Sequence, residues 1–268
     1  MRNNEYLITQ KKMFQILNFL AFMVVIIVNG LANTLPLGGN TTGELSALYP
    51  NLFVPAALTF AIWGVIYLTV GIFIIYQARD FFSKQKIRMP YLESIGWLFI
   101  VSCLANMSWI FAWHYRQVLL SLVAMLVLLF SLIMIYIRLD IGKEQVNSAT
   151  RYCVHLPFSL YLGWITVATI ANITAVLVHY NWQGWGLSEI FWTILVILAG
   201  TIIALINIIQ RGDIVYSVVI LWAYLGIIIK RYSTGDPPLM AIVFSAGLGM
   251  VFMVAGLLFF RKKGRIVK

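Results

Sequence analysis

Charged side chains are scarce in this sequence. Only 10% of the 268 residues are Asp, Glu, Lys or Arg, whereas 62% are hydrophobic. A soluble domain carries roughly 25% charged residues, which it needs to cover a surface that faces water. The shortage of charge therefore excludes a water-soluble globular protein. It predicts a chain surrounded by lipid, where only helices and closed barrels satisfy their own backbone.

Several features that enzymes and secreted domains use are also missing. The two cysteines, Cys103 and Cys153, lie inside or at the edge of apolar runs, so they indicate no disulfide framework. The sequence contains no phosphate-binding loop, dinucleotide glycine motif, metal-ligand cluster or nucleophile elbow. We therefore expect no catalytic residue, no metal and no bound cofactor, and we interpret the protein as not an enzyme.

Long apolar runs are what the sequence does have. Each is close to the 17–25 residues that cross a bilayer as a helix, and none alternates as a barrel strand would. The predicted fold class is an all-α integral membrane protein with about eight transmembrane helices, at residues 13–35, 54–78, 92–114, 118–138, 153–179, 189–209, 214–230 and 238–260. The first run is too long for a signal peptide, so we expect it to be retained.

The distribution of basic residues predicts the topology. With the N-terminus inside, the inner segments hold sixteen of the nineteen Lys and Arg residues, ending with Arg261, Lys262, Lys263, Arg265 and Lys268. Only Arg116, Lys230 and Arg231 fall outside. The positive-inside rule then puts both termini in the cytoplasm, and we expect a bacterial plasma membrane. The same rule explains the net charge of +10 without any nucleic-acid partner.

No charged residue lies deep within a predicted span. Glu93 and Glu189 stand at the beginnings of spans. Pumps and ion-coupled transporters keep ionisable groups at membrane depth for the coupling ion. Active transport is therefore disfavoured, whereas passive movement of a hydrophobic molecule remains an alternative.

Three spans carry aromatic and amide residues at helical spacing. They are Phe60, Trp63 and Tyr67 in the second span, Asn106, Trp109 and Trp113 in the third, and Pro157, Tyr161, Trp164, Ala168 and Asn172 in the fifth. At 1.5 Å per residue, most of these lie about 8 to 15 Å below the outer ends of their helices, deeper than an interfacial belt. The stripes predict either helix packing, with the amides bonding between spans, or a pocket for a flat, mostly apolar ligand. The loop over residues 36–53, in which Glu44 is the only charged residue, lies on the same side and is a candidate lid.

These stripes resemble motifs of the TspO/translocator family, the tryptophan-rich sensory proteins. Phe53-Val54-Pro55 followed by Phe60-Ala61-Ile62-Trp63-Gly64-Val65-Ile66-Tyr67 is similar to the start of the family's second span. Ala105-Asn106-Met107-Ser108-Trp109 is similar to its third span. Pro157-Phe158-Ser159-Leu160-Tyr161, with Trp164 to Asn172, is similar to its fifth span.

The resemblance covers residues 13–182 and implies a five-helix bundle, residues 1–182, with a pocket for tetrapyrroles, sterols or other aromatic ligands. The implied ligand-binding residues are Pro55, Phe60, Trp63, Tyr67, Asn106, Trp109, Trp113, Tyr161, Trp164, Ala168 and Asn172. No basic residue follows Tyr180 before Arg211, so the family's sterol-recognition pattern is not matched. The implied ligand is therefore porphyrin-like, haem-like or lipid-like.

Residues 183–268 lie outside the resemblance and are predicted to form a three-helix membrane extension. Ala241, Ser245 and Gly249 give it a stripe of small residues. We expect this stripe to pack against the protein's own helices, with a homodimer interface as the alternative.

Three functions follow in order of preference. The first is a sensory or regulatory protein that binds a hydrophobic aromatic molecule within the outer half of the bilayer. The second is a passive carrier that uses the same pocket. The third is an enzyme that degrades bound porphyrin, which the lack of catalytic groups disfavours.

Overall fold

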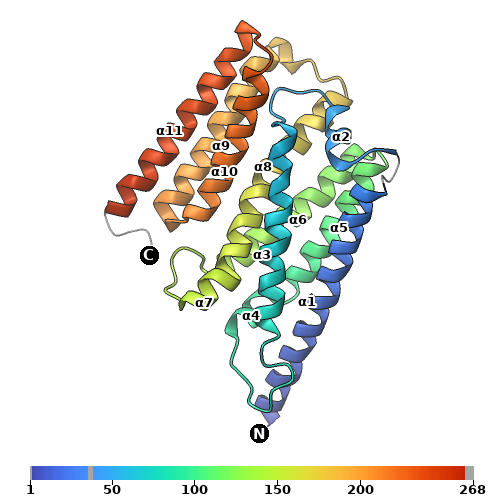
Figure 1. Ribbon diagram of the computed structural model, residues 1–268, viewed down its shortest axis with the longest axis vertical. Coiled ribbons are helices and arrows are strands. Elements are labelled where there is room, and N and C mark those ends of the chain that lie inside the picture. Colours follow the sequence, from blue (N-terminus) through green and yellow to red (C-terminus); the bar gives the residue numbers. More distant parts are fainter. Residues whose placement is uncertain (1, 36–38, 263–268) are drawn as a thin grey trace.

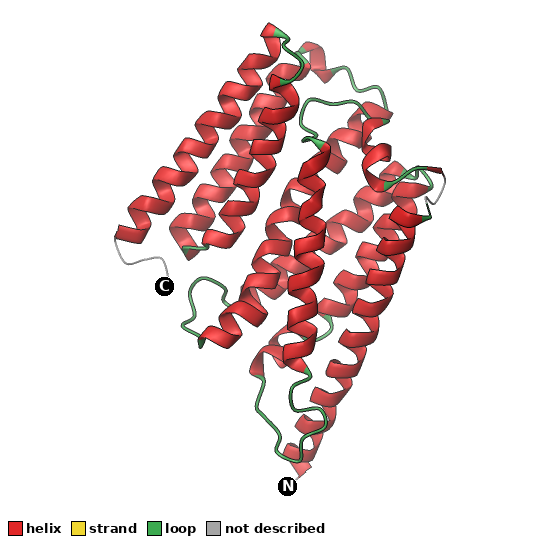
Figure 2. Ribbon diagram, viewed as in Figure 1, coloured by secondary structure: helices red, strands yellow, loops and turns green. Residues whose placement is uncertain are grey.

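The computed structural model describes residues 2–35 and 39–262. Every regular element within these two segments is a helix (Figure 2). Among the described residues, seven helices are long and apolar enough to cross a membrane, and Leu98–His114 is a shorter apolar helix. The predicted all-α membrane fold is confirmed. Pro36, which begins the predicted lid, and Lys263, Arg265 and Lys268 lie outside the described residues.

The long helices follow the predicted spans. They are α1 (Arg2–Thr34), α3 (Ile62–Gln77), α5 (Leu98–His114), α6 (Val118–Arg138), α8 (Leu156–His179), α9 (Glu189–Arg211), α10 (Ile214–Tyr232) and α11 (Met240–Lys262). Short helices precede or connect them: α2 (Thr42–Ala47), η2 (Ala57–Ala61), α4 (Pro90–Ile95), α7 (Ser148–Thr150), η3 (Arg151–His155), η4 (Gly184–Gly186) and η5 (Pro237–Leu239).

Three predicted spans are less regular than the sequence suggested. The second, predicted as 54–78, begins only at Ala57, with the 3-10 turn η2 before α3 starts at Ile62. The third, predicted as 92–114, is interrupted because Gly96 adopts a left-handed φ of 51°, which ends α4 before α5 begins at Leu98. The fifth begins with a π-helical turn, η3, shortly before Pro157. Proline lacks an N–H and its ring crowds the carbonyl four residues earlier, so a wider turn accommodates it.

Successive long helices run in alternating directions, so that α1 begins and α11 ends toward the same side of the molecule (Figure 1). An even number of crossings produces this arrangement. The cytoplasmic location of that side stays a prediction.

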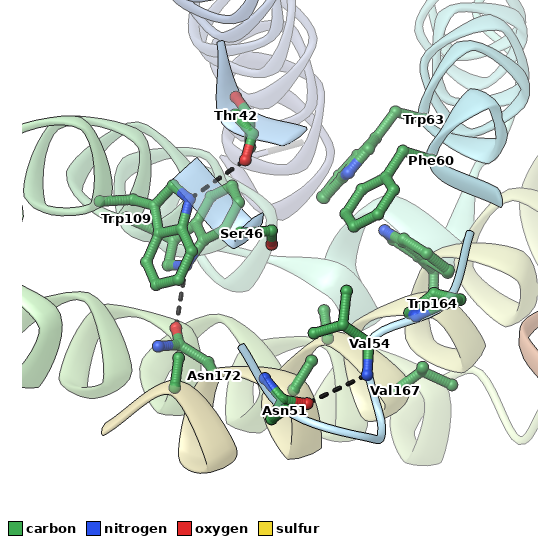
Figure 3. Close-up of a pocket in the computed structure, with 15 residues that line it drawn as sticks. Thr42, Ser46, Asn51, Val54, Phe60, Trp63, Trp109, Trp164, Val167 and Asn172 are labelled. Atoms are coloured by element: carbon green, nitrogen blue, oxygen red, sulfur yellow. Dashed lines mark hydrogen bonds between the residues drawn. The ribbon is translucent and has the colours of Figure 1, made fainter. Parts of the chain in front are cut away.

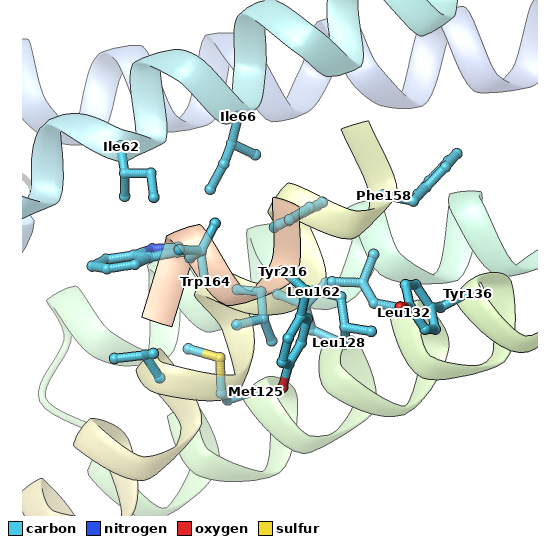
Figure 4. Close-up of a cluster of buried hydrophobic side chains, with 14 of the residues drawn as sticks. Ile62, Ile66, Met125, Leu128, Leu132, Tyr136, Phe158, Leu162, Trp164 and Tyr216 are labelled. Atoms are coloured by element: carbon cyan, nitrogen blue, oxygen red, sulfur yellow. The ribbon is translucent and has the colours of Figure 1, made fainter. Parts of the chain in front are cut away.

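Helix α8 lies between α3, α6 and α10 and contacts all three. Ile66 of α3, Leu128 of α6, Phe158 of α8 and Tyr216 of α10 are buried in this contact region (Figure 4). Because lipid tails are as apolar as these side chains, close packing rather than removal from water is what favours the contacts.

Helices α9, α10 and α11 form a layer beside the first five long helices (Figure 1). Gly212, with a φ of 63°, ends α9, and Asp213 caps α10 by accepting bonds from the Val215 and Tyr216 N–H groups. Gly249 allows α11 to approach closely, since a Cβ there would lie 2.6 Å from the Thr201 hydroxyl oxygen. This member of the small-residue stripe therefore faces the protein's own helices, whereas Ala241 is exposed.

Candidate ligand-binding site

Aromatic rings from α3, α5 and α8 meet around Trp63. The Trp63 ring stacks on Tyr67 and Trp109, with centroids 5.4 and 6.2 Å away. The edges of Tyr161 and Trp164 meet it at 6.0 and 6.3 Å. Offset-stacked and edge-to-face arrangements at these distances are the favourable ones for aromatic pairs. Three stripes that lie far apart in the sequence thus form one cluster.

A small cavity lies beside this cluster (Figure 3). Eight of the eleven predicted ligand-binding residues line it: Pro55, Phe60, Trp63, Trp109, Trp113, Trp164, Ala168 and Asn172. Its volume is about 40 Å³. That is room for water, and it is far below the roughly 300 Å³ or more of small-molecule sites. In this arrangement the rings therefore pack mainly on one another.

The other three predicted residues, Tyr67, Asn106 and Tyr161, do not line the cavity. Asn106 donates to the Tyr161 hydroxyl at 3.1 Å and accepts from Asn29 Nδ2 of α1 at 2.8 Å. The Asn106 side chain is fully buried. This amide therefore connects α1, α5 and α8 through interhelical hydrogen bonds, the packing alternative of the sequence analysis. Sequence reasoning missed Asn29, although an amide within an apolar run was the signal that singled out Asn106.

Asn172 has a different position, because it both bonds between helices and lines the cavity. Its Oδ1 accepts from the Trp109 indole N–H at 3.0 Å, and its Nδ2 donates to the Ser121 hydroxyl at 3.1 Å. These bonds join α5, α6 and α8. They also fix the plane of the Trp109 ring at the cavity wall (Figure 3).

The indole N–H of Trp164 has no hydrogen-bond partner in the described part of the chain. The side chain is only 2% exposed and lines the cavity. A buried donor without an acceptor is costly, by about 1–3 kcal/mol. The cavity wall therefore offers one unsatisfied donor to any occupant that carries an acceptor.

Residues 39–56, which we call the lid, supply Thr42, Ser46, Asn51, Val54 and Pro55 to the wall of the cavity. Helix α2 of the lid begins with a capping box between Thr41 and Glu44. The Thr41 backbone N–H and hydroxyl hold the pKa of the Glu44 carboxyl below its ordinary value. Thr42 contacts α5, since its carbonyl accepts from the Trp113 indole at 3.4 Å and its hydroxyl bonds the His114 ring at 3.1 Å.

Helix α10 holds the other end of the lid. Arg231 donates from Nη2 to the carbonyls of Asn51 and Val54, at 3.2 and 3.3 Å. The backbone N–H of Ala56 donates to the Gly226 carbonyl at 3.0 Å. Gly226 has no room for a side chain, because a Cβ there would lie 2.9 Å from Pro55 Cβ. In the sequence Arg231 served only as an outer basic residue, and nothing in the pattern marked it as buried.

The opposite end of the bundle has its own polar cluster, where α1 meets the loop after α3. Asp80 forms an ion pair with Lys11 and accepts bonds from Gln15 and from the Ile87 N–H. Burial raises the pKa of the Asp80 carboxyl, but the bonds from Lys11, Gln15 and Ile87 outweigh it and bring the pKa to about 2. This cluster secures α1 and takes no part in the cavity.

Comparison with known families supports the motif resemblance. A model of the TSPO-like protein family matches residues 15–259. The match extends through α9, α10 and α11, beyond the residues 13–182 that carry the motifs. No curated protein and no solved structure matches the chain. Because the family match covers most of the 268 residues, this integral membrane protein belongs to the TSPO-like protein family.

Proposed function

We propose that this membrane protein binds a flat, mostly apolar aromatic molecule of the porphyrin or haem class under the lid, in a sensory or regulatory role. The observation that carries the proposal is the convergence of Trp63, Trp109 and Trp164 from three helices beside one cavity. Indole faces provide large apolar contact with favourable ring stacking.

The polar groups of the cavity suit a ligand with a few acceptors. The free indole N–H of Trp164 would donate to a carboxylate or carbonyl on the ligand edge. Asn172 already has its amide partners, so its contribution is to hold Trp109 in place. No charged side chain lines the cavity among the described residues, which favours a ligand whose buried part is neutral.

Binding requires the cavity to enlarge, because about 40 Å³ cannot hold a tetrapyrrole. The lid is the part of the wall that can move without breaking a spanning helix, since it contributes only loop residues and the short helix α2. In this proposal the lid moves away from the helices when the ligand enters. The ligand then packs against the indole rings of Trp63, Trp109 and Trp164. A ligand signal would then reach α10 through Arg231, which is the regulatory part of the proposal.

Ligand-induced quenching of tryptophan fluorescence tests the proposal, with protoporphyrin IX as the probe. Replacing Trp63 or Trp109 with Ala should weaken binding by about 1–3 kcal/mol, because one aromatic face is lost. Trp185→Ala is the matched control, since Trp185 is 80% exposed and, among the rings that the structure describes, contacts only Trp182 and Trp192. Equal protoporphyrin affinities for all three variants would mean that the aromatic cluster serves helix packing and not ligand binding.

The same probe separates binding from passive transport. A receptor that only binds should leave the leak of protoporphyrin across a liposome wall unchanged when the protein is reconstituted. If the protoporphyrin flux across the liposome membrane rises with the amount of reconstituted protein, and is smaller for Trp63→Ala, the protein is a carrier and not a sensor.

A further inference from the structure

A second and larger cavity lies at the other end of the molecule from the lid. Its volume is about 770 Å³. It is bounded by the loop after α6, the π-helical turn η3 with the start of α8, the turn between α9 and α10, and the end of α11. It thus lies at the seam between the first five long helices and the C-terminal layer (Figure 1).

Two arginines line this cavity without a partner of opposite charge. Arg151 belongs to η3, and Arg261 lies near the end of α11. The described residues contain two ion pairs, Lys11–Asp80 and Arg211–Asp140, and neither involves these arginines. Their guanidinium groups are therefore available for an anion, which they can bind in a bidentate fashion.

His155 adds a buried polar group to the same wall. It is 7% exposed, lines the cavity, and makes no hydrogen bond to any residue that the structure describes. Arg151, His155 and Ser159 follow one another at intervals of four, so the π-helical turn and the first turn of α8 bring them to one face. Because the His155 ring lines the cavity, its imidazole N–H can donate to a polar occupant there.

Asp213 does not oppose an anion as strongly as its charge suggests. Its Oδ1 accepts from the Val215 and Tyr216 N–H groups, and its Oδ2 accepts from the Tyr136 and Ser159 hydroxyls. These four bonds, together with the positive end of the α10 dipole, offset the carboxylate. Glu144 at the exposed rim adds one more negative charge. That charge penalises a dianion such as free phosphate more than a monoanionic phosphodiester.

We propose that this cavity binds the phosphodiester of a phospholipid headgroup, with Arg151, Arg261 and His155 as its contacts. Leu156, Ile214 and Val215 supply apolar wall for the glycerol and the first acyl carbons. The cavity lies where spanning helices end, which is the depth of lipid headgroups. A lipid here would bridge α8 and α11, and so stabilise the packing of the C-terminal layer.

Thermal unfolding of the delipidated full chain in detergent tests this proposal. Phosphatidylglycerol should raise the melting temperature, whereas diacylglycerol with the same acyl chains should not. Arg151→Gln should weaken the apparent affinity for phosphatidylglycerol about tenfold or more, since a charge-assisted contact is lost. Arg261→Gln, at the exposed end of α11, should weaken it in the same direction. Arg88→Gln is the matched control, because Arg88 is exposed and outside the cavity.

Any one of three results would overturn the proposal. The first is a shift with diacylglycerol as large as that with phosphatidylglycerol. The second is parent-like lipid affinity in both cavity variants. The third is the full shift with inorganic phosphate alone, which would replace the lipid by a soluble phosphate ion. None of these measurements involves the aromatic cavity, so the outcome is independent of the proposed porphyrin site.

Discussion

Arg231 and Val54 are joined across the seam between the C-terminal layer and the lid. The guanidinium, buried at 7% exposure, donates to the Val54 carbonyl at 3.3 Å, and the same nitrogen reaches the Asn51 carbonyl. A residue from the last third of the chain thus helps to close a cavity lined by the first two thirds. This contact gives α10 a direct connection to the candidate ligand site.

Replacing Arg231 with Met should loosen the lid. Two charge-assisted bonds to backbone carbonyls are lost while the apolar stem is kept, which should reduce stability by about 1–3 kcal/mol. Hydrogen exchange at residues 39–56 should become faster, and the protoporphyrin on-rate should rise. Lys230→Met is the control, because both bonds to the lid come from Arg231 and not from Lys230. An unchanged exchange pattern in the lid would contradict a role for Arg231 in closing it.

Replacing Asn106 should affect mainly stability, whereas replacing Asn172 should affect both stability and porphyrin affinity. Asn106→Leu removes the bonds to Asn29 and Tyr161, so it should reduce stability by about 1–2 kcal/mol and leave porphyrin affinity in the folded fraction nearly unchanged. Asn172→Leu should reduce both, because it frees the Trp109 ring at the cavity wall. Melting temperature and fluorescence titration of the two variants measure the difference. The reverse pattern would mean that the ligand lies deeper, beside Asn106.

Acid should weaken the attachment of α1. The pKa of Asp80 is about 2 in the folded protein, below the ordinary value of about 4. A lowered folded-state pKa contributes stability that is fully present above pH 4 and is lost as the pH falls from about 4 to 2. Asp80→Asn should remove this pH dependence and lower stability at neutral pH. Melting curves between pH 2 and 7 would show both effects, and parallel curves for the two proteins would disprove the assignment.

The topology can be checked with single cysteines. Lys84→Cys lies in the loop after α3, and Gln183→Cys lies in the loop after α8; both positions are exposed. A membrane-impermeant maleimide added to intact cells should label Gln183→Cys, and it should label Lys84→Cys only after permeabilisation. The parent protein is the control, because Cys103 is buried and Cys153 is half-buried. Labelling of Lys84→Cys in intact cells would mean that the protein has the opposite orientation to the predicted one.

The sequence by itself determined the class, the spans and the family. Twenty-residue apolar runs have few alternatives in lipid, so α6, α9 and α11 follow their predicted ranges closely. Helical spacing alone also showed that Trp63, Trp109 and Trp164 lie on the aromatic faces of their spans. Of the eleven ligand-binding residues that the family resemblance implied, eight line one cavity.

Only the tertiary structure decided how those faces are used. Periodicity gives the direction of a side chain from its own helix but not the neighbour that it meets. For this reason Asn106 was grouped with the cavity, although its partners are Asn29 and Tyr161. The same limit hid Arg231 and His155, whose burial depends on segments far away in the chain. A charge at a helix end looks solvated in a sequence, and packing against a distant loop is what removes it from water.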